Sequence, residues 1–216
     1  MTDDIRHQYL DPSVAERYDR ERFSSFVGST FDRLEKRTLA GLLRRATNSI
    51  GEPLVLDAPC GTGRITEFLL GHGFNVTGAD ISVEMIQVAR EKCARFGSRA
   101  SWQRLDLEHI DLADGSVDLV TCIRLFHHLD TAARGRILRE LGRVSRRFVI
   151  VNMCFSSPVY RLRRRLKRRL GLGHSATSTT RDELTREVAE AGLRIEAERF
   201  VLPFVSEDLL VLLSKA

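Results

Sequence analysis

Along most of the chain, the pattern of hydrophobic and polar residues alternates between that of strands and that of helices. Five short segments have the length and residue types of strands, and the segments between them carry apolar residues at helical spacing. The predicted strands lie at 53–57, 74–79, 100–105, 117–123 and 147–153. The predicted helices between them lie at 63–71, 82–96 and 131–143. This alternation predicts right-handed βαβ units and a mainly parallel sheet that helices cover on both faces.

The two ends of the chain add helices and a hairpin to this pattern. Residues 12–27 and 29–47 have the composition of two helices that precede the sheet. Near the other end, Thr180-Arg-Asp-Glu183 is a capping box, which predicts a helix beginning there. The apolar segments 194–202 and 208–214 then predict two strands that form a hairpin.

The first predicted strand ends in an acidic residue and leads into a glycine turn, Asp57-Ala-Pro-Cys-Gly-Thr-Gly63. Glycine is needed where the backbone takes a positive φ or lets a ligand approach it closely. A helix begins after the turn, and its free N–H groups suit an anion. The second strand ends at Asp80, where a carboxylate is placed to accept hydrogen bonds from both hydroxyls of a ribose. The stretch therefore predicts a binding site of the nucleotide type.

Two common nucleotide motifs are absent from this turn. The dinucleotide fingerprint needs a third glycine at the position of Thr66, and a P-loop needs Gly-Lys-Ser/Thr. A Tyr-x-x-x-Lys pair, which a nicotinamide-dependent oxidoreductase could use for hydride transfer, is also absent. These observations argue against that class of enzyme.

The glycine turn and Asp80 together resemble the first motifs of the class I S-adenosylmethionine-dependent methyltransferases, particularly the small-molecule and quinone-type group. The family motif is Asp-x-Gly-x-Gly-x-Gly; Pro59 stands here at its first glycine, and Gly61 and Gly63 match the other two. The resemblance covers about residues 50–216 apart from a basic segment. It implies an α/β fold: a Rossmann-like, doubly wound sheet of seven strands, mostly parallel with an antiparallel last strand, and helices on both faces.

We expect one methyltransferase domain over residues 1–216. Its parts are an N-terminal helical lid, the cofactor-binding core, a basic insert, and a C-terminal helix with the strand hairpin. They span residues 1–48, 49–155, 156–179 and 180–216.

The resemblance implies S-adenosyl-L-methionine as cofactor and S-adenosyl-L-homocysteine as its product. Asp57 would orient the ammonium group, directly or through water, and Asp80 would hold the ribose. Ile81 would pack on the adenine, Asp106 would accept from its amino group, and Leu107 would lie beside the ring. A turn or capping role is the alternative for Asp106. The cofactor-binding candidates are Asp57, Ala58, Pro59, Cys60, Gly61, Gly63, Asp80, Ile81, Met85, Asp106, Leu107 and Ile123.

The segment after the fourth strand, Arg124-Leu-Phe-His-His-Leu129, faces the transferred methyl group in the family. Relatives that methylate base or amide nitrogen carry Asn/Asp-Pro-Pro-Tyr there, and this chain does not. The resemblance therefore favours an oxygen, carbon or sulfur atom of a small-molecule or lipid-like acceptor. If the acceptor must lose a proton, His127 or His128 would serve as the base, and Arg124 would bind an acidic substrate group. The alternative is that one histidine caps or packs against the next helix.

The composition of the chain bears on its location and on metal binding. The 216 residues are 43% hydrophobic and 29% charged, and no run approaches the roughly 18 apolar residues of a membrane span. The first residues are acidic and polar, without a signal-peptide core. The four cysteines have no paired spacing, and Cys-x-x-Cys and His-Glu-x-x-His motifs are absent. We expect a cytoplasmic protein without a metal site; a thiophilic site at Cys122 and Cys154 is the alternative.

The basic character of the chain is local. Seven basic residues and no acid lie between Val159 and Gly173, and removing them from the net charge of +5 leaves −2 for the rest. Apolar residues recur among them at helical spacing, which predicts an amphipathic helix over Arg161–Arg169 with a narrow apolar stripe. We expect this segment to contact an anionic membrane or lipid, so that the cytoplasmic protein would be peripheral at a membrane. A nucleic acid and a merely solvated helix are the alternatives. The second functional class is an RNA-directed methyltransferase or a catalytically silent RNA- or membrane-binding module. The sequence does not indicate an oligomeric state.

Overall fold

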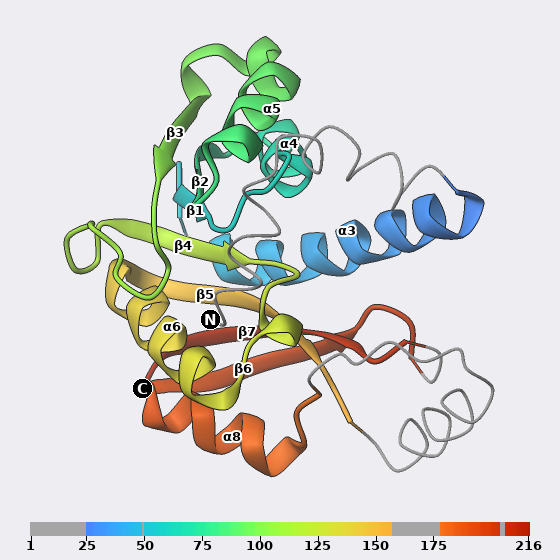
Figure 1. Ribbon diagram of the computed structural model, residues 1–216, viewed down its shortest axis with the longest axis vertical. Helices are drawn as coiled ribbons and strands as arrows, with labels where there is room; N and C mark the ends of the chain where they lie inside the picture. Colours follow the sequence, from blue (N-terminus) through green and yellow to red (C-terminus); the bar gives the residue numbers. More distant parts are fainter. Residues whose placement is uncertain (1–24, 49, 157–177, 204–205) are drawn as a thin grey trace.

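Figure 1 shows the computed structural model of the protein, an α/β sheet with helices on both faces. The structure describes residues 25–48, 50–156, 178–203 and 206–216. Residues 12–24 of the predicted helix at 12–27, and the basic residues Arg161–Arg169, therefore lie outside the described residues.

The described residues form a seven-stranded sheet in the order β3-β2-β1-β4-β5-β7-β6. Strands β1 to β5 run parallel to one another, and β7 runs antiparallel to both β5 and β6. The strand bounds are β1 (Leu54–Asp57), β2 (Asn75–Asp80), β3 (Ala100–Arg104), β4 (Val117–Cys122), β5 (Ser145–Cys154), β6 (Leu193–Phe200) and β7 (Asp208–Lys215). The predicted strands, the hairpin and the antiparallel last strand are confirmed. The order of the strands reverses between β1 and β4, and ligands of such sheets bind outside the carboxyl ends at this point.

The helices divide between the two faces of the sheet. Their bounds are α3 (Phe26–Thr47), α4 (Arg64–Gly71), α5 (Val83–Cys93), α6 (Thr131–Val144) and α8 (Arg181–Glu190), with short 3₁₀ turns η1 (Ala94–Arg99) and η2 (Phe126–His128). Successive residues of β5 belong to different apolar clusters: Val149 packs with α6 and α8, and Ile150 packs with α3 and α4. This alternation is the period of a strand that is buried on both faces.

Helix α3 begins at Phe26, since the Ser25 side chain accepts a hydrogen bond from the Gly28 amide at 3.0 Å. The predicted break between residues 27 and 29 is therefore wrong. The helix is also part of the core, because Leu39 and Leu43 are almost fully buried in the cluster against the sheet. This half of α3 therefore contributes to the core, and the lid over residues 1–48 stays a prediction.

The C-terminal helix follows the sequence signal closely. The Glu183 amide donates to the Thr180 hydroxyl at 3.3 Å, and the Thr180 amide donates to the Glu183 carboxylate at 2.8 Å. The predicted capping box is therefore confirmed.

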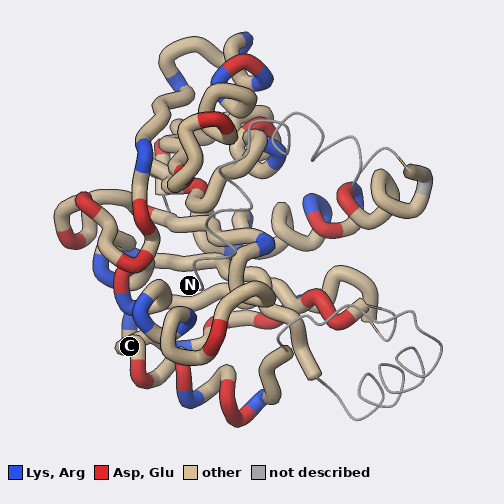
Figure 2. Tube along the Cα trace, in the orientation of Figure 1, with Lys and Arg blue, Asp and Glu red and all other residues tan. Residues whose placement is uncertain are grey.

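Figure 2 shows that the positions of basic and acidic residues are interspersed along the described helices and loops. Among the described residues, no helix combines the length and the apolar composition that a bilayer crossing requires.

Candidate functional site

The glycine turn lies where the carboxyl ends of β1 and β2 meet. These strands are parallel neighbours, with Asp57 opposite Gly78. The Cys60 amide donates to the Ala79 carbonyl at 2.8 Å, and the Gly61 amide donates to the Asp80 carboxylate at 2.9 Å. The turn is therefore tied to the end of β2 through its backbone, and the predicted residues of both motifs come together.

Two glycines in this turn meet different requirements. Gly63 has φ +79°, and a Cβ there would lie 2.9 Å from Cα of Ala89 in α5, so its hydrogen is needed for helix packing. Gly61 has φ +50°, and a Cβ there would meet no atom within 4 Å. Open space beside a positive-φ glycine lets a ligand lie against the backbone.

Asp80 is buried at the end of β2, and both of its oxygens accept backbone hydrogen bonds. Oδ2 accepts from Gly61, and Oδ1 accepts from the Ser82 amide at 3.0 Å. Burial raises the pKa of this carboxyl above its ordinary value, although the backbone amides of Ser82, Gly61 and Ile81 favour its charged form. A carboxylate has about four lone-pair sites. Asp80 therefore keeps some acceptor capacity beyond its backbone contacts, which fits a ribose hydroxyl.

Asp57 is more deeply enclosed than the sequence indicates. Its carboxylate is fully buried and accepts from the Thr66 hydroxyl at 2.6 Å and from the Thr121 hydroxyl at 2.8 Å. Burial raises the pKa of Asp57 to about 6, and both hydroxyls oppose that rise. The side chain thus joins β1 to α4 and β4 beneath the turn. Its influence on a ligand ammonium would be electrostatic, and the role remains a prediction.

The segment after β3 places Asp106 in a turn. Its carboxylate accepts from the Glu108 amide at 3.0 Å, and its backbone bridges to His109. This geometry agrees with the turn role, and it leaves the predicted contact with an adenine amino group as a prediction. Leu107 is buried in the core beside it.

The segment after β4 presents three candidate acceptor-side residues. Arg124 has φ +65°, which is rare for a residue with a Cβ. His127 and His128 are half-buried in η2, with ring centroids 4.0 Å apart. The next helix, α6, is capped by Asp130, whose side chain accepts from the Ala133 amide at 2.8 Å. The histidines are therefore not its N-cap, although they lie in the turn that precedes it.

The remaining predicted cofactor residues line the ends of the same strands. Ala58 and Met85 are buried, Cys60 and Ile123 are nearly so, and Pro59 and Ile81 are half-buried. They follow β1, β2 and β4, apart from Met85 in the first turn of α5. Apart from Met85, these residues therefore lie at the carboxyl edge of β1, β2 and β4, whereas Asp106 and Leu107 follow β3.

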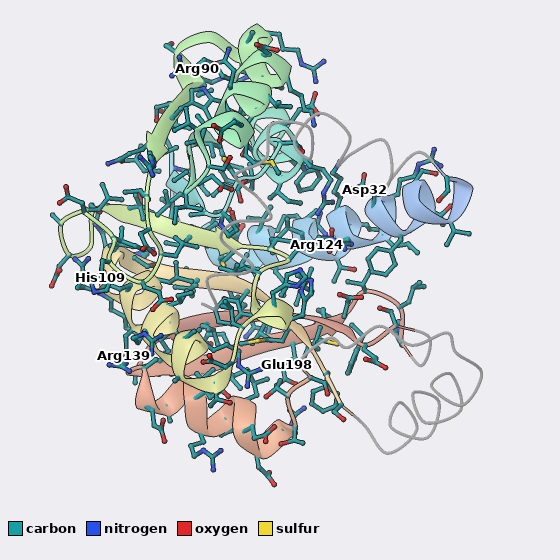
Figure 3. All side chains as sticks on the ribbon, in the orientation of Figure 1. Asp32, Arg90, His109, Arg124, Arg139 and Glu198 are labelled. Carbon is teal, nitrogen blue, oxygen red and sulfur yellow. The ribbon has the colours of Figure 1, made fainter. Side chains whose placement is uncertain are left out.

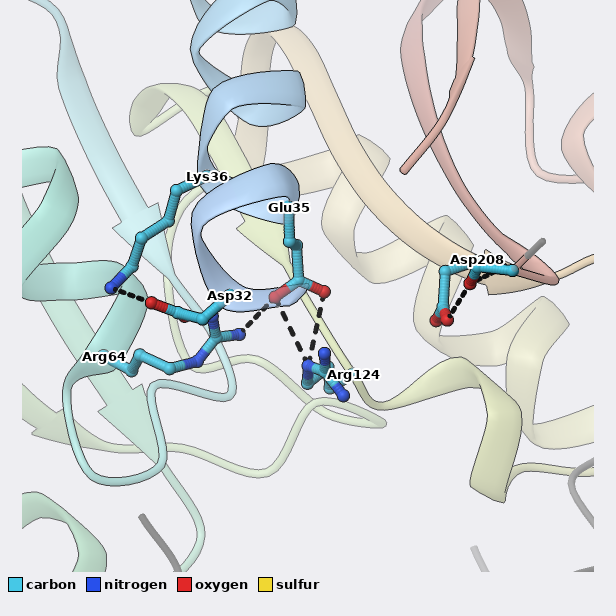
Figure 4. Close-up of polar contacts among 7 residues, drawn as sticks. Asp32, Glu35, Lys36, Arg64, Arg124 and Asp208 are labelled. Carbon is cyan, nitrogen blue, oxygen red and sulfur yellow. Dashed lines mark hydrogen bonds and ion pairs between the residues drawn. The ribbon is translucent and has the colours of Figure 1, made fainter. Parts of the chain in front are cut away.

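An ionic cluster at this edge could not be foreseen from strand ends. Glu35 of α3 is fully buried and receives Arg64 Nη2 at 2.6 Å and Arg124 Nε at 3.2 Å. Arg64 also pairs with Asp32, which Lys36 Nζ approaches at 2.9 Å. Figure 4 shows the two guanidinium groups reaching Glu35 from different segments, and Figure 3 shows Arg124 beside α3.

Electrostatics in this cluster favour the charged forms. Burial alone would lower the pKa of Arg64, but Glu35 and Asp32 raise it above its ordinary value. Burial alone would raise the pKa of Asp32, but Lys36 and Arg64 lower it. Both groups therefore stay ionised at neutral pH.

The cysteines do not form the thiophilic site that was the alternative. Cys122 is fully buried in the apolar cluster beside α6, and its register partner on β5 is Val151 rather than Cys154. The Cys154 thiol instead donates to the Glu207 carboxylate at 3.3 Å. Within the described ranges, no group of three or more His, Cys, Asp or Glu side chains is arranged to hold a metal ion.

Comparison with known families gives a match over the same region. Residues 55–147, a little under half of the chain, match the family described as a methyltransferase domain.

Curated relatives match the chain over the same core. Ubiquinone biosynthesis O-methyltransferase from Erwinia tasmaniensis is 38% identical over 76 residues, which are 35% of this chain and 31% of that protein. The enzyme of the same name from Pectobacterium atrosepticum is 33% identical over 98 residues, or 45% and 40% of the two chains. An uncharacterized Synechococcus protein is 38% identical over 90 residues, 40% of this chain and 22% of its own length. The matches thus span between 22% and 40% of these curated relatives.

Solved structures share the whole fold. Magnesium protoporphyrin IX methyltransferase from Synechocystis PCC 6803, crystallised with bound S-adenosylhomocysteine, superposes with a TM-score of 0.80 at 20% identity, covering 99% of this chain and 100% of that one. The methyltransferase in complex with the Haloferax volcanii Trm112 activator gives a TM-score of 0.68 at 17% identity, covering 94% and 96%. At these identities the likeness establishes the fold.

Proposed function

We propose that the chain is a class I S-adenosylmethionine-dependent methyltransferase, because residues 55–147 match the methyltransferase-domain family and the fold is that of a solved methyltransferase. It would transfer a methyl group from S-adenosylmethionine to a small-molecule or lipid-like acceptor. The acceptor atom would be oxygen, carbon or sulfur, and S-adenosylhomocysteine would be released. The observation that carries the proposal is the pairing of Asp80 with the Gly61 amide beside open space in the turn.

The proposed donor site uses groups at the ends of β1 and β2. Gly61 lets a ligand approach the backbone, and Asp80 accepts from the ribose hydroxyls. The fully buried Asp57 carboxylate contributes negative charge beneath the position of the ammonium group. When bound, the sulfonium donor supplies an activated methyl group with a good leaving group. The residues of the chain would contribute mainly by positioning the two reactants.

The acceptor side follows β4. His127 or His128 would take the proton of a hydroxyl or thiol acceptor, since both lie in the turn after this strand. Arg124, held in the ionic cluster, would attract an acidic acceptor group. The similar proteins include methyltransferases named for ubiquinone biosynthesis and for magnesium protoporphyrin IX, which supports a small-molecule acceptor.

Turnover with labelled donor tests this function. The protein would be incubated with quinols, phenols, thiols and acyl acids, and with RNA as the competing class. We expect label in at least one small molecule. Label in RNA alone would contradict the small-molecule proposal, and binding of donor without any transfer would favour a silent module.

The basic segment Arg161–Arg169 supports a second part of the proposal. We propose that the protein is cytoplasmic and contacts anionic membrane through this segment, because seven basic residues stand there without an acid. Co-sedimentation with anionic and neutral vesicles at low and high salt tests the contact. Equal binding to both lipid types, or none at low salt, would contradict it.

A further inference from the structure

Helix α3 carries one acidic residue on its apolar face. Glu35, Leu39, Leu42, Leu43 and Ala46 are spaced as one stripe of the helix and are all buried against the sheet. Glu35 alone in this stripe is charged, and it has no exposed surface. A buried ion pair is often no more stable than apolar residues of the same size. Stability alone therefore does not account for a carboxylate at this position.

The two arginines that reach Glu35 come from the two halves of the candidate site. Arg64 is the first residue of α4 and directly follows Gly63 of the turn. Arg124 directly follows Ile123 after β4, on the side where the acceptor is expected. Glu35 binds both guanidinium groups, at 2.6 Å and 3.2 Å, and each arginine side chain is only 13% exposed.

The backbone at Arg124 needs support from its surroundings. A left-handed conformation costs a residue with a Cβ about 1–2 kcal/mol, and Arg124 has φ +65°. Its guanidinium group is fixed by Glu35 and lies over the Phe31 ring, 5.2 Å from the centroid. Both supports are side chains of α3, one helical turn apart.

We propose that Glu35 is a positioning residue that fixes Arg124 on the acceptor side and joins it, through Arg64, to the donor-binding turn. Binding of S-adenosylhomocysteine at the turn then orders residues 124–129 as well as the start of α4. The inference rests on the proposed function, because it assigns the ligand of the turn.

Hydrogen exchange with S-adenosylhomocysteine as the probe tests this link. In the wild type, saturating ligand should slow exchange at the start of α4, in α3 and in residues 124–129, where amides such as those of His128 and Leu129 are already hydrogen-bonded. In Glu35→Gln the shape of the side chain is kept and the charge is lost. Protection of α4 should remain, and ligand-dependent protection of residues 124–129 should fall at least fivefold.

The chain offers a matched control on the other face of the sheet. Glu187 of α8 pairs with Arg134 of α6 at 2.7 Å, and both side chains are 3% exposed. Glu187→Gln removes an equally buried charge and should leave the ligand-dependent protection of residues 124–129 unchanged. If Glu35→Gln does not fold, Glu35→Leu removes the charge while it continues the apolar stripe.

The outcomes separate the inference from the function on which it rests. If ligand protects α4 but not residues 124–129 in the wild type, or if Glu35→Gln retains that protection, the inference is wrong and the donor site stands. If Glu187→Gln loses the same protection, the effect is one of general stability and the inference is again wrong. If ligand protects no segment of the wild type, both the inference and the proposed function are overturned.

Discussion

Two buried arginine–carboxylate clusters lie on opposite faces of the sheet, and they differ in what their arginines connect. Arg134 and Glu187 both lie within helices and join α6 to α8. Glu35 lies within α3, but its partners Arg64 and Arg124 stand where a turn ends and where a strand has just ended. The first cluster joins two helices of the scaffold. The second joins a helix to two segments that carry candidate site residues, so similar ion pairs connect scaffold elements on one face and candidate site segments on the other.

The largest effect on stability is expected when the buried Arg134–Glu187 pair is broken. Glu187→Ala leaves the Arg134 charge buried without its partner and should lower the free energy of unfolding by about 3–5 kcal/mol. The double variant Arg134→Met/Glu187→Leu should recover most of that loss, because no charge stays buried. Urea unfolding measures both variants. A double variant no more stable than Glu187→Ala would show that the pair itself, rather than the orphaned charge, stabilises α6 against α8.

The two glycines of the turn also allow a structural role to be compared with a ligand-binding role. Gly63→Ala should lower the free energy of unfolding by about 2–4 kcal/mol, because its Cβ would approach the Ala89 backbone to 2.9 Å at positive φ. Gly61→Ala meets no protein atom, so it should cost only about 1–2 kcal/mol of stability and weaken S-adenosylhomocysteine binding instead. Unfolding and calorimetry on both variants test this difference. Equal losses of stability, or unaltered binding in Gly61→Ala, would contradict the roles assigned to the two residues.

Asp57 offers a pH test of the charge held beneath the turn. Its folded pKa of about 6 lies above the ordinary value of 3.8, so the folded state holds the proton more tightly. The protonated group therefore stabilises the folded state. This contribution is fully present below pH 3.8, and it is lost as the pH rises through 6 and the carboxyl ionises. Asp57→Asn should therefore be more stable than the wild type by about 1–3 kcal/mol at pH 7.5, since a tenfold difference in proton affinity corresponds to about 1.4 kcal/mol.

The difference in unfolding free energy between Asp57→Asn and the wild type, measured at pH 4, 6 and 7.5, isolates this group from the other carboxylates. The advantage of the variant should shrink towards pH 4. A difference that does not change with pH would show that Asp57 is not a buried charge at neutral pH.

The sequence predicted the strand ends better than the links between them. Asp57, Gly61 and Asp80 follow apolar runs or stand in a glycine turn, so local pattern located them, and the parallel sheet brought them together. Glu35 is separated from Arg64 by 29 residues and from Arg124 by 89. Such a contact depends on how α3 packs across the sheet, which local pattern does not specify. The one available signal was an acid in the apolar stripe of α3.

For Asp57, too, the sequence predicted only part of what the structure shows. Its position at a strand end was predicted, but its enclosure by Thr66 and Thr121 was not. In the sequence, Thr66 stands out only as a residue in place of a glycine, and Thr121 only as part of a strand. Their hydroxyls reach Asp57 because α4 and β4 converge beneath the turn, which is a property of the assembled fold.

Calorimetric titration with S-adenosylhomocysteine, on the wild type and on Asp80→Ala, tests the central claim most directly. The wild type should bind one equivalent, and the variant should bind about ten- to a hundredfold more weakly, because two ribose hydroxyls lose their acceptor at about 1.5–3 kcal/mol in total. Thermal unfolding of both proteins without ligand confirms that they are folded at the titration temperature. Equal affinities for the two proteins, or no binding by the folded wild type, would contradict the assignment of the strand-end site.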